Sequence, residues 1–128
     1  MRTTADWQRA DTAHFLHPFT DFQSLAKKGS RIITRAEGIY LWDSEGHKIL
    51  DAMSGLWCVN VGYGQESVVQ AATEQMRKLP YATGYFDFAS EPAIRLAAKL
   101  AELTPASLTR AYLTLGGSEA VEIGRAHV

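Results

Sequence analysis

Apolar side chains recur at helical spacing in three stretches of the chain, which we expect to be helices. These stretches cover residues 6–15, 66–79 and 91–103. A proline follows each stretch within three residues, and the residue before a proline disfavours the α region, so each helix is expected to end there. Ser90 suits the N-cap of the third helix, because an acid and a proline occupy its first turn.

Runs of β-prone residues lie between the first two helices. Residues 31–36 are β-branched in their middle and predict a strand. Residues 38–43 and 47–51 predict a hairpin, because the three residues between them end in Gly46, where such a loop needs a positive φ. Residues 27–30, just before these strands, predict a turn.

Glycines flank a short apolar run around Trp57. Gly55 precedes this run and Gly62 follows it, so we expect a loop-rich segment whose backbone packs closely against other atoms. Two interpretations of Trp57 stay open, a side chain of the core and a wall of a pocket. The same choice applies to other aromatic residues, since loop aromatics beside proline and glycine line many ligand clefts; they are Phe19, Tyr81, Tyr85, Phe86 and Phe88.

A fourth β-prone run, residues 111–115, predicts a strand that leads into Gly116, Gly117 and Ser118 and then a helix start. The order of helix, strand, glycine turn and helix start indicates the opening of an α/β domain. A glycine turn at a helix N-terminus can hold a phosphate through backbone N–H groups, with Ser118 as a further donor. The alternative is an ordinary turn with Ser118 as the N-cap. The motif is neither a P-loop nor the dinucleotide pattern.

Composition excludes several classes of protein. The formal net charge of −1 disfavours nucleic acid or an anionic membrane as the main partner. No stretch has the apolar length of a membrane span, and residues 1–13 lack the apolar core of a secretory signal. Cys58 is the only cysteine of the 128 residues, so no internal disulfide forms, which fits the reducing cytoplasm.

Other candidate sites are weak. His14 and His17 have a metal-like spacing, but no carboxylate or cysteine near them completes a ligand set, so no metal site is expected. Cys58 has apolar neighbours and no histidine nearby, which predicts a buried, inert thiol. No serine–histidine–aspartate constellation follows from the spacing.

Several motifs resemble a known family. They are H-x-x-H-P-F-T at residues 14–20, the run G-I-Y-L-W-D-S-E-G-H-K-I-L-D-A-M-S-G-L-W-C-V-N-V-G-Y-G at 38–64, L-A-E-L-T-P at 100–105 and Y-L-T-L-G-G-S-E-A-V at 112–121. With these motifs the chain resembles the N-terminal part of a class III (omega) aminotransferase dependent on pyridoxal 5′-phosphate. Within the family it is most similar to transaminases that act on amines or ω-amino acids with pyruvate.

The resemblance implies an α/β fold, the fold-type I architecture of pyridoxal-phosphate-dependent transferases. Residues 1–65 would be the N-terminal arm and the β-hairpin segment of the small domain. Residues 66–121 would begin the large, cofactor-binding domain. Residues 122–128 resemble a translated sequencing adapter, so we expect a non-native tail.

The resemblance also assigns roles to single residues. Gly117 and Ser118 would hold the phosphate of the cofactor. Five apolar side chains would form the substrate pocket: those of Phe19, Leu56, Trp57, Tyr85 and Phe86. Leu56 and Trp57 would wall it, Phe19 would close it, and the last two would reach the pocket of a neighbouring subunit in a homodimer.

Family members are several-fold longer than this chain. The lysine that forms the Schiff base, the acid at the pyridine nitrogen, the stacking aromatic and the carboxylate-binding arginine are all missing. The resemblance therefore predicts no catalytic residue here and a fragment that does not transaminate by itself. Two other functions stay open, a phosphate-binding module without catalysis and a purely structural domain. We also expect no single cooperative unfolding transition, because a sheet with one strand leaves its apolar faces without partners.

Overall fold

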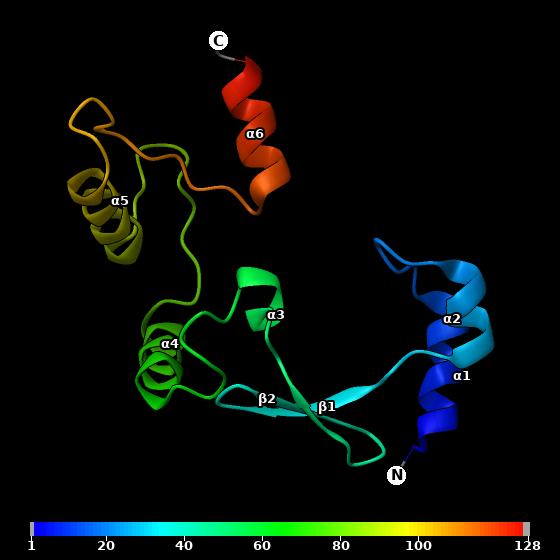
Figure 1. Cartoon of the computed structure of the whole chain (residues 1–128). Helices are drawn as coiled ribbons and strands as arrows, with labels where there is room; N and C mark the ends of the chain where they lie inside the picture. Colours follow the sequence, from blue (N-terminus) through cyan, green and yellow to red (C-terminus); the bar gives the residue numbers. More distant parts are fainter. Residues whose placement is uncertain (1, 127–128) are drawn as a thin grey trace. The chain divides into compact units, whose positions relative to one another are not determined.

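The structure is a computed structural model that describes residues 2–126 of the chain. It divides into two compact units, Met1–Gln75 and Met76–Val128, each of which is described by itself. The elements follow the chain in the order shown in Figure 1. Within the described residues, no helix combines the length and the apolar content that a membrane span requires.

Two helices open the first unit. The predicted helix is confirmed as α1, Thr4–His14, which begins with a capping box between Thr3 and Asp6. A second helix, α2, Phe22–Lys28, was not predicted. Asp21 is its N-cap and accepts hydrogen bonds from two backbone N–H groups, and Gly29 ends it with a φ of 72°. The predicted turn at residues 27–30 is therefore the end of this helix.

The predicted strands form a three-stranded antiparallel sheet in the order β1-β2-β3. The strands are β1, Ile33–Glu37, β2, Tyr40–Asp43, and β3, Lys48–Leu50. Figure 1 shows β1 and β2 side by side. Gly46 has a φ of 87° in the hairpin loop, as expected from the sequence. The hairpin prediction is therefore confirmed, with strands slightly shorter than the β-prone runs.

The segment after β3 returns to the sheet. It contains a single short turn, α3, Ser54–Trp57. Tyr63 then pairs with Gly38 through two backbone hydrogen bonds of 2.8 and 3.0 Å. The glycine-rich segment is thus a loop that is tied to the sheet at both of its ends.

The remaining helices are α4, Glu66–Lys78, α5, Glu91–Leu103, and α6, Gly117–Ala126. The first two confirm the predicted helices. Ser90 is the N-cap of α5 as predicted, but its side chain makes no capping hydrogen bond. In the second unit, Lys78 and Glu91 form an ion pair of 3.0 Å between the end of α4 and the start of α5.

For the end of the chain, one expectation is wrong and one open alternative is excluded. Residues 111–115 form no strand, because no strand of the described residues lies beside them to accept their hydrogen bonds. Ser118 lies inside the first turn of α6 and is not its N-cap, because the helix already begins at Gly117. Of the expected tail, residues 122–126 continue α6, whereas 127 and 128 lie outside the described residues.

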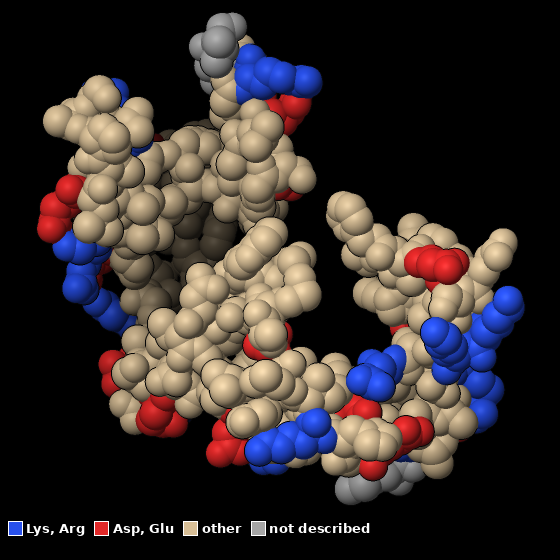
Figure 2. All heavy atoms as spheres, viewed as in Figure 1, with Lys and Arg blue, Asp and Glu red and all other residues tan. Residues whose placement is uncertain are grey.

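The described residues contain no buried hydrophobic side chain, and Asp43 is the one buried residue among them, at 5% exposure. The apolar faces of α4 and α5 are open, with Met76 at 63% and Ile94 at 59% exposure. On the face drawn in Figure 2, lysine and arginine lie interspersed with aspartate and glutamate. Secondary structure is therefore held by local hydrogen bonds and caps rather than by a core.

Candidate functional site

Left-handed backbone occurs at four of the five residues expected to form the pocket. In the described chain, six residues other than glycine have a φ in the left-handed region. Such residues are costly and persist where surrounding structure enforces them, often at functional sites. Four of the six are expected pocket residues; the full set is Phe19, Ser54, Leu56, Trp57, Phe86 and Asp87.

The α3 turn has a left-handed backbone throughout. The φ angles of Ser54, Gly55, Leu56 and Trp57 are 51°, 59°, 59° and 66°. Leu56 and Trp57 are 57% and 77% exposed, so the core interpretation of Trp57 is wrong for this structure. For an L-residue the left-handed helix costs roughly 1–2 kcal/mol, so this turn needs support from its surroundings.

Asp51 supplies that support. Its carboxylate accepts hydrogen bonds from the backbone N–H of Met53 at 3.1 Å, from that of Gly55 at 2.7 Å and from the hydroxyl of Tyr63 at 2.7 Å. The Tyr63 hydrogen bond lowers the pKa of Asp51 most, and the backbone donors add to it. The same bond raises the pKa of Tyr63. A charged carboxylate with three donors is a strong local anchor.

Gly55 fits this turn for a second reason. A Cβ at this position would lie 2.8 Å from Cγ2 of Val59 and 3.1 Å from the hydroxyl of Tyr63. Both distances are too short for ordinary contacts, so any side chain here displaces its neighbours. The glycine flanks seen in the sequence predicted this close packing.

Phe19 lies in the loop between α1 and α2. Its φ is 47°, and its side chain is fully exposed. It borders a shallow hollow of about 300 Å³ beside Ser24 and Leu25 of α2. The loop is braced by a 2.8 Å hydrogen bond from the hydroxyl of Thr20 to the carbonyl of Pro18.

Tyr85 and Phe86 share one turn of the second unit. Their ring centroids lie 6.2 Å apart, and the N–H of Phe88 donates to the carbonyl of Tyr85 at 3.2 Å. Tyr85 and Phe86 are 69% and 86% exposed. Tyr81 and Phe88 are exposed as well, so none of these aromatics belongs to a core in this structure.

Gly117 and Ser118 form the first turn of α6. The first N–H groups of a helix have no partner within it and carry partial positive charge. Nothing lies within 4 Å of the Cβ position of Gly117, so the backbone is open to a ligand. The Glu119 carboxylate lies 3.1 Å from the Cβ position of Gly116. An anionic group is therefore already folded back onto this helix end.

The expected site residues are distributed over both units. Phe19, Leu56 and Trp57 belong to the first unit, and the others to the second. Leu56 and Trp57 share one turn, and Tyr85 and Phe86 share another. The structure thus shows the separate parts of the expected site, each with its own local support.

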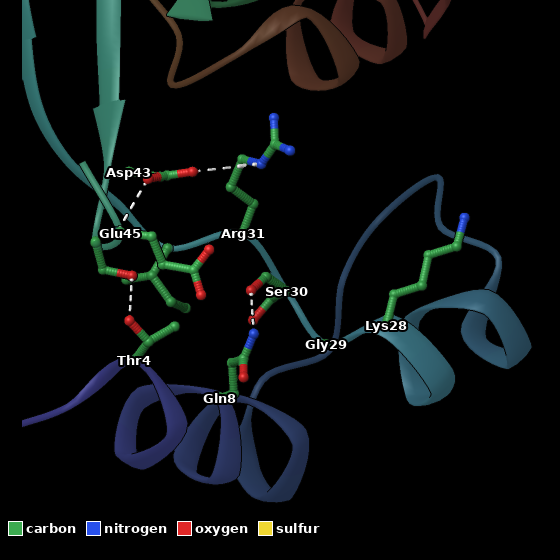
Figure 3. A pocket seen from close by; sticks show the side chains of 10 residues that line it. Thr4, Gln8, Lys28, Gly29, Ser30, Arg31, Asp43 and Glu45 are labelled. Carbon is green, nitrogen blue, oxygen red and sulfur yellow. Dashed lines mark hydrogen bonds and ion pairs between the residues drawn. The ribbon is translucent and has the colours of Figure 1, made fainter. Parts of the chain in front are cut away.

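A polar cavity of about 290 Å³ lies elsewhere in the first unit (Figure 3). It lies among α1, the segment after α2 and the hairpin loop, and none of the expected site residues lines it. Gln8 donates to the carbonyl of Ser30 at 3.0 Å, and the hydroxyls of Thr4 and Ser44 lie 2.8 Å apart across it.

Asp43 closes one side of this cavity and organises the hairpin loop. Burial opposes its charge, yet hydrogen bonds from the backbone and ring of His47 and the backbone of Glu45 lower its pKa overall. Ligand atoms of Asp43, Glu45 and His47 lie within 4.8 Å of one another. This cluster was not predicted, although its three residues stand at every second position of the sequence. The hydrogen bonds of Asp43 to Glu45 and His47 stabilise the hairpin loop.

Two further expectations are corrected. A carboxylate does lie near the histidines, since His17 Nε2 is 2.9 Å from Asp11 Oδ1, and this hydrogen bond lowers the pKa of Asp11. The loop after α1 returns His17 to Asp11, which lies six positions earlier in the chain. Cys58 is an exposed free thiol rather than a buried one, because the α3 turn packs against no apolar layer.

Comparisons with known proteins give one consistent result. Residues 24–125 match the family described as aminotransferase class-III. The putrescine–pyruvate aminotransferase of Pseudomonas aeruginosa is 55% identical over 117 residues, which are 91% of this chain and 26% of that protein. The hypotaurine/taurine–pyruvate aminotransferase of Paracoccus denitrificans is 40% identical over 114 residues, 88% of this chain and 24% of that protein.

Solved structures agree. An (S)-enantioselective omega-transaminase from Thermomicrobium roseum matches with a TM-score of 0.89 and 40% identity, over 97% of this chain and 28% of its own. The PMP-bound form of an aminotransferase from Vibrio fluvialis matches with a TM-score of 0.87 and 33% identity. The match covers 92% of this chain and 26% of the Vibrio fluvialis chain. The chain is thus a mixed α/β structure that spans about a quarter of the length of these relatives.

Proposed function

Because the chain belongs to the class III aminotransferases, we propose that it forms part of an enzyme that transfers an amino group from an amine or ω-amino acid to pyruvate or another α-keto acid. The amine leaves as a carbonyl compound, and pyruvate leaves as alanine. The observation that carries this proposal is the identity to a putrescine–pyruvate aminotransferase along nearly the whole chain. The proposal concerns the whole enzyme, of which this chain supplies the matching quarter.

The proposed architecture is the fold-type I transferase, with residues 1–65 as the arm and the hairpin segment of the small domain. Residues 66–121 begin the large domain, and 122–128 are a non-native tail. All three strands and the Gly38–Tyr63 bridge precede residue 65, and α4 begins at Glu66. These element bounds support the proposed boundary between residues 65 and 66, whereas α6 runs across the one between 121 and 122.

The start of α6 is the proposed seat of the cofactor phosphate. Backbone N–H groups at Gly117 and Ser118, with the Ser118 hydroxyl, would hold it, and an exposed Glu119 side chain would move aside. The carboxylate that folds onto this helix end supports the fit of an anion. Pyridoxal 5′-phosphate, when bound, supplies the electron sink of the reaction.

Leu56 and Trp57 are the proposed wall of the substrate pocket, and Phe19 closes it. Tyr85 and Phe86 would reach the pocket of a second subunit in a homodimer. Their exposure and their enforced left-handed turns support a role in contacts beyond this chain. The free thiol of Cys58 agrees with the proposed cytoplasmic location.

A chimera tests the proposed function. In it, the matching stretch of this chain replaces that of the Pseudomonas aeruginosa putrescine–pyruvate aminotransferase; we call this protein the chimera. We expect it to form alanine from pyruvate and a diamine, with the unaltered enzyme as the control. A folded chimera that binds pyridoxal 5′-phosphate but makes no alanine would favour the phosphate-binding module instead.

A further inference from the structure

We propose that Asp51 and Tyr63 position Leu56 and Trp57, and so determine which amines the pocket accepts. This inference rests on the proposed function, since it takes those two side chains as the pocket wall. Asp51 and Tyr63 themselves are positioning residues, because they act through the α3 turn.

The first step is that the turn cannot hold its shape unaided. Ser54, Leu56 and Trp57 all adopt left-handed backbone, which only glycine visits freely. Without support these residues would relax toward ordinary conformations. The exposed side chains of Leu56 and Trp57 make no core contacts that would hold the turn.

The second step is that one carboxylate supplies the support. Asp51 Oδ1 accepts from the N–H of Met53, just before the turn, and Oδ2 accepts from the N–H of Gly55, inside it. The turn is closed by the N–H of Trp57, which donates to the carbonyl of Met53 at 3.0 Å. The carboxylate therefore fixes the residue that precedes the turn and the residue at its centre.

The third step is that the carboxylate is itself fixed to the sheet. The N–H of Asp51 donates to the carbonyl of Ile39 at 2.9 Å, and the Tyr63 hydroxyl holds Oδ2. Tyr63 is tied in turn to Gly38 by its two backbone hydrogen bonds. The orientation of the turn thus derives from the end of the hairpin, an ordered element, which is how precise sites are supported.

Together these contacts connect the sheet to the proposed pocket wall. Removing the Asp51 charge or the Tyr63 hydroxyl does not change Leu56 or Trp57 themselves. It removes the hydrogen bonds that hold the α3 turn and so orient these two side chains. A substrate that relies on that wall should then be misplaced, whereas a substrate too small to reach it should not.

The kinetic test compares Asp51→Asn and Tyr63→Phe in the chimera. For a bulky arylalkyl amine we expect kcat/KM to fall about ten-fold or more, since small misplacements are costly. For L-alanine as donor we expect less than a two-fold change, and the same affinity for pyridoxal 5′-phosphate. A merely structural role would reduce both donors alike, and that result would overturn the proposal.

Asp6→Asn is the matched control. Asp6 is another half-buried aspartate whose pKa is lowered by hydrogen bonds, here from Thr3, and it lies at the start of α1. We expect its replacement to change neither donor preference nor cofactor affinity. Equal loss of selectivity in Asp6→Asn would also contradict the proposal.

A second measurement does not depend on activity and uses the folded chimera. With 5-fluorotryptophan incorporated, the ¹⁹F signals of Trp42 and Trp57 are assigned by Trp42→Phe and Trp57→Phe. Asp51→Asn and Tyr63→Phe should shift or broaden the Trp57 signal and leave the Trp42 signal unchanged. A Trp57 signal that does not respond overturns the positioning role. An inactive chimera would count against the proposed function only, and the fluorine signal would still decide the inference.

Discussion

At the residue scale, the chain concentrates its backbone strain where function is expected. The glycines around Trp57 correctly predicted a closely packed loop, whereas the aromatics beside proline and glycine were left open between core and pocket. The left-handed conformations of Leu56 and Phe86 could not be predicted, because nothing in their residue types favours them. The Asp51–Tyr63 hydrogen bond joins residues twelve positions apart and was equally hidden.

Gly55→Ala should destabilise the chimera by about 2–4 kcal/mol, because strain adds to a close contact. A Cβ at Gly55 meets Val59 at 2.8 Å, whereas one at Gly46 meets nothing within 4 Å. Gly46→Ala is therefore the matched control, with left-handed strain alone and an expected cost of about 1–2 kcal/mol. Denaturant unfolding measures both, and equal costs would contradict the close packing.

Acid should release the α3 turn. The pKa of Asp51 lies below its ordinary value of 3.8, chiefly because of the Tyr63 hydrogen bond. A lowered pKa means that the carboxylate stabilises the turn above pH 3.8 and that this support is lost as the pH falls through the lowered value. In an NMR titration the Gly55 amide should change with a midpoint below 3.8. Asp51→Asn should abolish this transition, and a midpoint above 3.8 would contradict the account.

At the element scale, periodicity and turn signals predicted the helices and the hairpin, whose formation depends on interactions within a few residues. The hairpin, α1, α4 and α5 were predicted because spacing, Gly46 and the prolines each act within a few residues. The seven residues of α2 are too few for a periodic pattern, and Asp21 as N-cap was the overlooked signal. The prediction of a strand at residues 111–115 is wrong, because a strand forms only beside a second strand, which the local sequence does not specify.

The apolar face of α5 should matter only in the longer enzyme. Ile94 is 59% exposed here, so Ile94→Ala should change the helix content of this chain very little. In the chimera, where we expect the face to be covered, the same change should cost about 2–4 kcal/mol. Arg95→Ala on the same helix is the control and should cost under about 1 kcal/mol in both proteins. Circular dichroism and denaturant unfolding provide these values.

At the scale of the whole molecule, the proposed function rests on family membership, and the chain contains only part of the proposed site. The described residues bury no hydrophobic side chain, and the expected site residues are divided between two units. The sequence motifs predicted the family, which the comparisons confirm, whereas the roles of the site residues stay a prediction. We expect an assembled pocket only together with the rest of the enzyme, because this chain spans about a quarter of the relatives' length.

The chain alone should unfold gradually with temperature. Cooperative melting requires a shared core, and the described residues have none. We expect a broad loss of far-ultraviolet circular dichroism, weak near-ultraviolet signal and strong binding of a hydrophobic dye at low temperature. The unaltered Pseudomonas enzyme is the control. A sharp transition of the chain alone would contradict the prediction, because it would require a hydrophobic core.

The central claim is that this stretch holds the cofactor phosphate at the start of α6. The most direct measurement is the dissociation constant of pyridoxal 5′-phosphate for the chimera with Ser118→Ala. Loss of a hydrogen bond to a charged group should weaken binding roughly ten-fold. Ser90→Ala, at the start of α5 with no capping hydrogen bond, is the matched control and should bind as tightly as the chimera. Unchanged affinity in Ser118→Ala, or equal weakening in both variants, would contradict the claim.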